Sequence, residues 1–89
     1  VRNIGFLIRI LPTAKKRAER HFKRAIELSR EIGAKAILGR SYLDLGLLYK
    51  NKGKTDQARK CLSQAKEFLQ QTEAKGYLEQ VNEALQSLK

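Results

Sequence analysis

His21 and Cys61 are the side chains of this 89-residue sequence whose types could act together in metal binding or nucleophilic catalysis. A structural zinc site needs four ligands and a catalytic one needs three and a water, so one His and one Cys are too few. A catalytic pair needs hydrogen-bond contact, which helix axes roughly 8–10 Å apart make difficult for the short Cys side chain. We therefore interpret His21 as solvated and Cys61 as a half-buried thiol.

Asp44 is the remaining candidate for acid–base chemistry, and it has no second carboxylate at helical spacing to work with. The sequence also contains no phosphate-binding loop, no HExxH metal motif and no nucleophile elbow. We predict no catalytic residue, no cofactor site and no metal site, and hence no enzyme activity of this chain itself. A longer parent protein could still be an enzyme.

The elements that would position these residues are helices. Apolar residues recur every three or four positions from Ala14 to Ile32, which is the period of an amphipathic helix. Pro12-Thr13 begins this helix, with Thr13 as the predicted N-cap, and Gly33 ends it. Its apolar stripe consists of Ala18, Phe22, Ala25, Ile26, Leu28 and Ile32.

Three further helices are predicted by the same reasoning. The second runs from about Lys35 to Asn51 and closes at the turn 51–54. Thr55 or Asp56 caps the third helix, and a short last helix follows Lys75. The third carries Ala58, Leu62, Ala65, Phe68 and Leu69, and the last carries Tyr77, Leu78, Val81, Ala84, Leu85 and Leu88. No segment alternates as a half-buried strand does.

A repeat with a period of forty residues relates these helices, since Ala34-Lys35 recurs as Ala74-Lys75. Gly46 lies inside the second helix, where Gly costs about 0.5–1 kcal/mol relative to Ala. Its presence predicts that a neighbouring helix passes too close for a side chain. The structural positions of the repeat are Ala18, Phe22 and Ala25 in the first copy and Tyr42, Leu45, Gly46, Tyr49, Gly53, Ala58, Leu62 and Ala65 in the second.

The string YLDLGLLY, followed by KGKTDQARKCLSQA, resembles the tetratricopeptide (TPR) repeat, a helix-turn-helix unit. The resemblance implies an all-α fold in which antiparallel helix-turn-helix repeats stack as a short right-handed solenoid. Two features depart from the family pattern: the period is forty rather than about 34 residues, and no Pro closes the unit near Gln70-Gln71. HEAT-like repeats, also near forty residues, are the alternative fold, but they do not explain the Leu-Gly-x-x-Tyr string.

We expect a single domain over residues 1–89. Residues 1–11 would end a first helix, 13–32 would form the second helix of the first unit, 34–72 the second unit and 76–88 a capping helix. Because the sequence begins without Met, we expect a piece of a longer protein, near its C-terminus. The repeats also resemble the C-terminal repeats of large bacterial signalling proteins, which implies a scaffolding or regulatory tail of an adenylate or guanylate cyclase-like enzyme.

The family resemblance also implies a groove, lined by the first helix of each unit, that holds a peptide or helix from a partner. Family members that bind chaperone carboxylates have Lys and Asn where this chain has Leu43 and Leu47, which argues against a carboxylate clamp. Helix 35–51 is apolar nearly all round, so either neighbouring helices cover both its sides or it offers an apolar groove. The groove residues are Arg40, Leu43, Asp44, Leu47, Lys50 and Asn51, then Gln80, Glu83 and Ser87, with Arg2, Phe6 and Arg9 on the first helix.

The net charge of +10 makes nucleic-acid or anion binding the alternative function. The charge is one-sided, since residues 1–60 hold sixteen Lys and Arg against five Asp and Glu, and residues 61–89 hold three against four. No aromatic residue interleaves the basic clusters as a base-stacking surface requires. We favour a solvated basic face, with an acidic protein segment, an anionic membrane and nucleic acid as the remaining ligands.

Cysteine content and hydropathy bear on compartment. The single Cys excludes an intramolecular disulfide and fits the reducing cytoplasm, which is the predicted localisation. The apolar run Ile4–Leu11 is shorter than the roughly 20 residues of a membrane span. The partners left open are a separate protein or peptide, the rest of the same chain, and a second copy in a homodimer.

Overall fold

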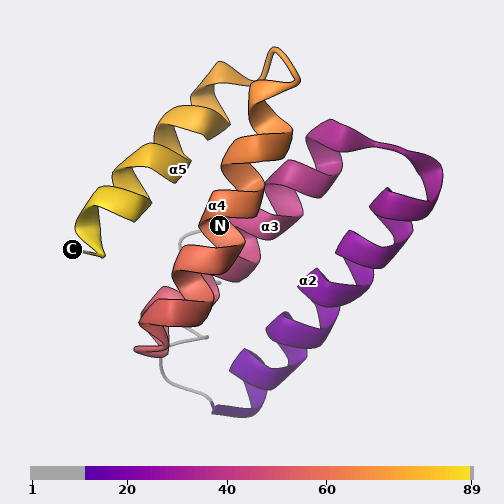
Figure 1. Cartoon of the computed structure of the whole chain (residues 1–89). Coiled ribbons are helices and arrows are strands. Elements are labelled where there is room, and N and C mark those ends of the chain that lie inside the picture. The colour runs from indigo at the N-terminus through magenta and orange to yellow at the C-terminus, as the bar shows by residue number, and fades with distance from the viewer. Residues whose placement is uncertain (1–11, 89) are drawn as a thin grey trace.

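The computed structural model describes residues 12–88, which form four helices and, within that range, no strand (Figure 1). They are α2 (Pro12–Ile32), α3 (Lys35–Asn51), α4 (Thr55–Gln70) and α5 (Lys75–Ser87). Successive helices run antiparallel, so the predicted all-α fold of stacked helix-turn-helix repeats is confirmed. The helix end predicted over residues 1–11 lies outside the described residues.

The central helix is α3, which packs against each of the other three (Figure 1). Leu45 and Tyr49 are buried toward α2, whereas Leu43 is buried on the side of α4 and α5. Among the large apolar side chains between Leu38 and Tyr49, Leu47 is the exposed exception. The sequence left two alternatives for this apolar helix, coverage by neighbouring helices on both sides or an apolar groove. Coverage on both sides is correct for most of its surface.

Two hydrophobic clusters meet at the α3 and α4 pair. One joins α2 to this pair and the other joins α5 to it, so each outer helix is held by its own cluster. The α2 cluster is Ile26, Leu38, Leu45, Leu48, Tyr49 and Ala58, and the α5 cluster is Leu43, Leu62, Ala65, Leu69, Val81 and Ala84. Ala18, Phe22 and Tyr42 are partly buried against the first cluster.

Two glycines allow α3 and α4 to pack closely. A Cβ added to Gly46 would lie 2.8 Å from Leu62 Cγ, and one added to Gly39 would lie 2.7 Å from Leu69 Cγ. Both distances are well below the roughly 3.5–4.0 Å at which carbon atoms pack favourably. The close approach predicted for Gly46 is confirmed. Gly39 lies two turns earlier on the same face and has the same role, which the sequence reasoning did not assign.

Glycine turns end α2 and α3 in the same way. Gly33 and Gly53 have φ values of 70° and 76°, in the left-handed region that favours Gly. The amide after each Gly donates back to a carbonyl in the last helical turn, from Ala34 to Ser29 and from Lys54 to Tyr49, both at 2.9 Å. These are Schellman-type caps. The helix ends predicted at Gly33 and at the turn 51–54 are thus confirmed.

The predicted N-caps are wrong. α2 begins at Pro12, so Thr13 lies inside its first turn; Pro is favoured there because its fixed φ suits a helix and its missing N–H leaves no donor unpaired. α4 begins at Thr55 with Lys54 in the N-cap position and no side-chain cap hydrogen bond, so neither Thr55 nor Asp56 is the cap. The hydrogen bond from the Lys54 amide to the Tyr49 carbonyl fixes where α4 starts. Thr55 and Asp56 therefore already lie within the helix.

Candidate functional site

A groove between α3 and α5 brings together five of the twelve predicted binding residues. It is shallow and open to solvent, with a volume of about 270 Å³. Leu47 and Lys50 contribute from α3, and Gln80, Glu83, Ala84 and Ser87 contribute from α5. We call it the α3/α5 groove. Ala84 was assigned to the core by its place in the apolar stripe, and it is nearly buried, so it forms part of the floor.

Leu43 is not a groove residue. Its side chain is 1% exposed and packs with Leu62, Leu69 and Val81, so a partner in the groove could not reach it. The prediction was wrong because α5 covers this side of α3, and Leu43 lies one turn from Leu47 on the covered side. Within residues 12–88, Leu47 is the large apolar side chain of α3 that is accessible at the groove.

The other predicted residues of α3 lie around the groove rather than in it. The Arg40 guanidinium sits over the Tyr77 ring, 5.4 Å from its centroid, which joins the start of α3 to α5. Asp44 is half-buried, and this burial raises the pKa of its carboxyl, opposed by the charges of Arg40 and His21. Asn51 is exposed at the last position of α3. Arg2, Phe6 and Arg9 lie outside the described residues.

The α3/α5 groove has little net charge. Lys50 and Glu83 contribute one charge of each sign, and Gln80 adds an amide. The Ser87 hydroxyl donates to the Ala84 carbonyl in its own helix at 2.8 Å, so what it can offer a ligand is its acceptor capacity. With Leu47 at 38% exposure, the groove offers one apolar contact and a small set of polar ones.

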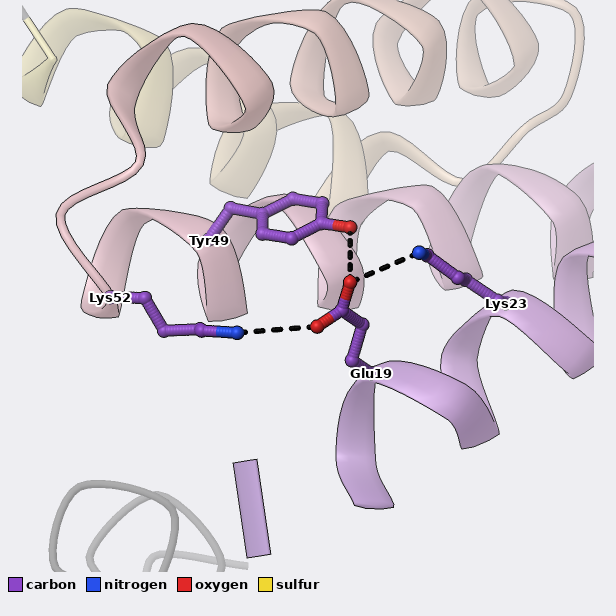
Figure 2. A network of polar contacts seen from close by, with 4 residues as sticks. All are labelled: Glu19, Lys23, Tyr49 and Lys52. Carbon is purple, nitrogen blue, oxygen red and sulfur yellow. Dashed lines mark hydrogen bonds and ion pairs between the residues drawn. The ribbon is translucent and has the colours of Figure 1, made fainter. Parts of the chain in front are cut away.

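A polar network fixes α2 against the end of α3 (Figure 2). The Glu19 carboxylate accepts a hydrogen bond from the Tyr49 hydroxyl at 2.7 Å and ion-pairs with Lys23 at 3.0 Å and Lys52 at 3.2 Å. These contacts, the Tyr49 hydrogen bond first, lower the pKa of Glu19 from 4.5 to about 2. Two helices, α2 and α3, and the turn after α3 therefore converge on one ionised carboxylate.

A second groove, larger than the first, runs between α2 and α4. It is open to solvent, with a volume of about 830 Å³. Its floor contains Tyr42 of α3, whose ring stacks on Phe68 with centroids 5.8 Å apart and planes at 7°. The lining residues are Arg30 of α2, Tyr42 of α3, and Asp56, Arg59, Lys60, Cys61, Ser63 and Gln64 of α4. We call it the α2/α4 groove. Sequence reasoning missed it because it depends on where α2 and α4 lie relative to each other.

His21 and Cys61 have different neighbours. His21 packs edge-on against Phe22 and influences Asp44, whereas Cys61 lines the α2/α4 groove near Lys23 and Glu19. Burial raises the pKa of the Cys61 thiol, which disfavours the nucleophilic thiolate. Within residues 12–88, no group of three or more His, Cys, Asp or Glu side chains is placed to hold a metal ion.

Antiparallel helix pairs that share one central helix and leave grooves between their neighbours define a helical-repeat protein. Residues 39–68, from the first third of α3 to the end of α4, match the family described as tetratricopeptide repeat. The match supports a tetratricopeptide repeat in this segment, and such repeats generally mediate protein–protein interaction. No curated protein and no solved structure matches the chain significantly.

None of α2 to α5 is both long and apolar enough to cross a bilayer.

Proposed function

We propose that this protein is a non-catalytic interaction module that holds a peptide or a helix of a partner in the α3/α5 groove. The observation that carries the proposal is the meeting of Leu47, Lys50, Gln80, Glu83 and Ser87 in one groove beside a tetratricopeptide repeat. The polar and apolar lining suits a peptide, which needs an apolar anchor and partners for its main chain.

The lining also restricts the ligand. An aliphatic or aromatic side chain would pack on Leu47 and the Ala84 floor, while Gln80 would pair with peptide groups. The opposite charges of Lys50 and Glu83 favour a segment with a balanced charge. A ligand recognised mainly through its terminal carboxylate needs a cluster of cationic groups, which the lining of this groove does not contain.

The test is selection of binders from a random peptide library, followed by affinity measurements on two variants. Leu47→Glu places a charge in the groove and should lower affinity at least about tenfold, since a buried unpaired charge at an interface is costly. Ile37→Glu is the matched control, because Ile37 is an exposed aliphatic residue of the same helix that does not line the groove. Equal effects of the two changes would overturn the proposal.

The charge of the chain favours one alternative function. α2 holds seven Lys and Arg against three Glu, and Lys16, Arg17, Arg20 and Arg24 are exposed on it. If this face binds nucleic acid, log affinity for duplex DNA should fall with log salt by about 0.9 per phosphate contact, and charge reversal at Lys15, Lys16 and Arg17 should flatten that slope. We expect a shallow slope and weak duplex binding.

The cellular setting of this proposal rests on sequence alone. The resemblance to repeats of cyclase-like signalling proteins favours a regulatory or scaffolding role for the module within a larger cytoplasmic protein. In that setting the occupant of the groove would be either a separate protein or another part of the same chain. Competition between selected peptides and a longer form of the chain separates these cases.

A further inference from the structure

The α2/α4 groove has a different character from the α3/α5 groove. Arg30 lines it from α2, and Arg59 and Lys60 line it from α4, against the single carboxylate of Asp56. Asp56 is itself 3.8 Å from Arg59. Tyr42 and Leu47 mark the two grooves on α3 and are five residues apart, which at 3.6 residues per turn places them on different faces. The two grooves are therefore separate surfaces.

The floor of the α2/α4 groove is held in place before any ligand binds. The Tyr42 ring stacks on Phe68, and the Tyr42 hydroxyl accepts a hydrogen bond from Arg30. Cys61 is half-buried beside it. A ligand therefore meets a fixed apolar floor and does not have to order it, which lowers the entropic cost of binding.

Further positive charge lies in the Glu19 network, whose residues do not line the groove. There, Lys23 and Lys52 provide two ammonium groups for the one carboxylate of Glu19 (Figure 2). Lys23 and Glu19 both act electrostatically on Cys61, in opposite directions, so the network is within electrostatic range of the groove. On the α4 wall, Ser63 and Gln64 offer a hydroxyl and an amide that can pair with a peptide main chain.

We propose that the α2/α4 groove binds an acidic peptide segment, with its carboxylates toward Arg30 and Lys60 and its main chain along Gln64. Charge complementarity identifies this occupant. A second copy of this chain, with a net charge of +10, would bring like charges together. Single-stranded nucleic acid needs open aromatic faces for its bases, whereas Tyr42, the one aromatic ring among the described lining residues, is stacked on Phe68.

Cys61 makes the proposal testable at this site alone. The chain contains one Cys, so the rate of thiol labelling by a soluble aromatic disulfide reports on the α2/α4 groove and on nothing else. The probe is a fluorescein-labelled peptide of alternating glutamate and alanine, and the control probe replaces glutamate with lysine. We expect the acidic peptide to bind by fluorescence anisotropy and to slow Cys61 labelling, and the basic peptide to do neither.

Two double variants with the same change in charge locate the site. Arg30→Glu with Lys60→Glu should weaken acidic-peptide binding about tenfold or more and restore fast labelling. Arg17→Glu with Lys16→Glu is the matched control, because both residues are exposed on α2 and do not line the groove. In this control variant the acidic peptide should still protect Cys61 from labelling. Far-ultraviolet circular dichroism and the milder pair Arg30→Gln with Lys60→Gln guard against a folding defect.

Several outcomes would overturn the proposal. One is equal loss of binding in the two double variants, which would mean that only net charge matters. Another is protection of Cys61 by a polythymidine single strand that exceeds protection by the acidic peptide. A third is slower labelling on raising the protein concentration alone, which would identify a second copy as the occupant. Binding of the acidic peptide without protection of Cys61 would place it elsewhere.

Discussion

Replacing Gly46 with Ala tests the close contact on which the α3 and α4 pair depends. The new Cβ would lie 2.8 Å from Leu62 Cγ, 2.9 Å from Leu62 Cδ2 and 3.3 Å from Cys61 Cβ. Leu62 is fully buried, and Cγ is the branch point of its side chain, so the clash cannot be relieved by moving a flexible end. The helices must separate or Leu62 must leave its rotamer.

The expected magnitude follows from two opposing effects. Overpacking of a well-packed core typically costs about 1–3 kcal/mol. The replacement of Gly by Ala inside a helix returns about 0.5–1 kcal/mol. We therefore expect the free energy of unfolding to fall by about 1 kcal/mol, within a range of about 0–2.5 kcal/mol. Each kcal/mol lowers Tm by about 4–8 °C in a domain of this size.

The assay is thermal and urea unfolding followed by circular dichroism at the helix band. Gly76→Ala is the matched control, since Gly76 lies in α5 and an added Cβ there meets nothing within 4 Å. That change should leave stability unchanged or raise it. The reasoning would be refuted by a Gly46→Ala protein that is stabilised as much as Gly76→Ala.

Three further changes test other parts of the structure. Because the folded pKa of Glu19 is lowered from 4.5 to about 2, its contribution to stability should be complete above pH 4.5 and lost as pH falls toward 2. Glu19→Gln should remove this loss of stability at low pH and lower the free energy of unfolding by about 1 kcal/mol at pH 7, measured by urea titration. Glu27 forms an exposed pair with Arg24, so Glu27→Gln should change the free energy of unfolding little in the same titration. Leu69→Ala should cost about 2–5 kcal/mol because its fully buried side chain fills the space opposite Gly39. The exposed side chains of Leu28, Ile32 and Ile37 should promote self-association at high protein concentration. Light scattering should show less self-association for Ile32→Lys than for the parent protein. A parent protein that stays monomeric at every concentration would refute this prediction.

Local sequence signals predicted most of the fold. Gly33 and Gly53 end their helices through positive φ values that few other residues adopt, and the spacing of Ala58, Leu62 and Ala65 identifies the face of α4 that packs. These signals depend on neighbours within one helical turn. They were therefore readable without knowing how the helices are arranged.

The candidate site was only partly predictable, for a reason seen at Leu43 and Leu47. Both are leucines on α3, one turn apart, and only the position of α5 decides that the first is buried and the second lies in the groove. The α2/α4 groove likewise depends on the relative placement of two helices and on the stacking of Tyr42 on Phe68. Apolar periodicity encodes neither the position of α5 relative to α3 nor that of α2 relative to α4.

The most direct test of the proposed function is amide chemical-shift mapping by nuclear magnetic resonance with a library-selected peptide. The account predicts that the largest shifts on titration fall on Leu47, Lys50, Gln80, Glu83 and Ala84, and that Leu47→Glu abolishes them while Ile37→Glu does not. Shifts confined to the basic face of α2, at Lys16, Arg17 and Arg20, with none in the α3/α5 groove, would contradict it.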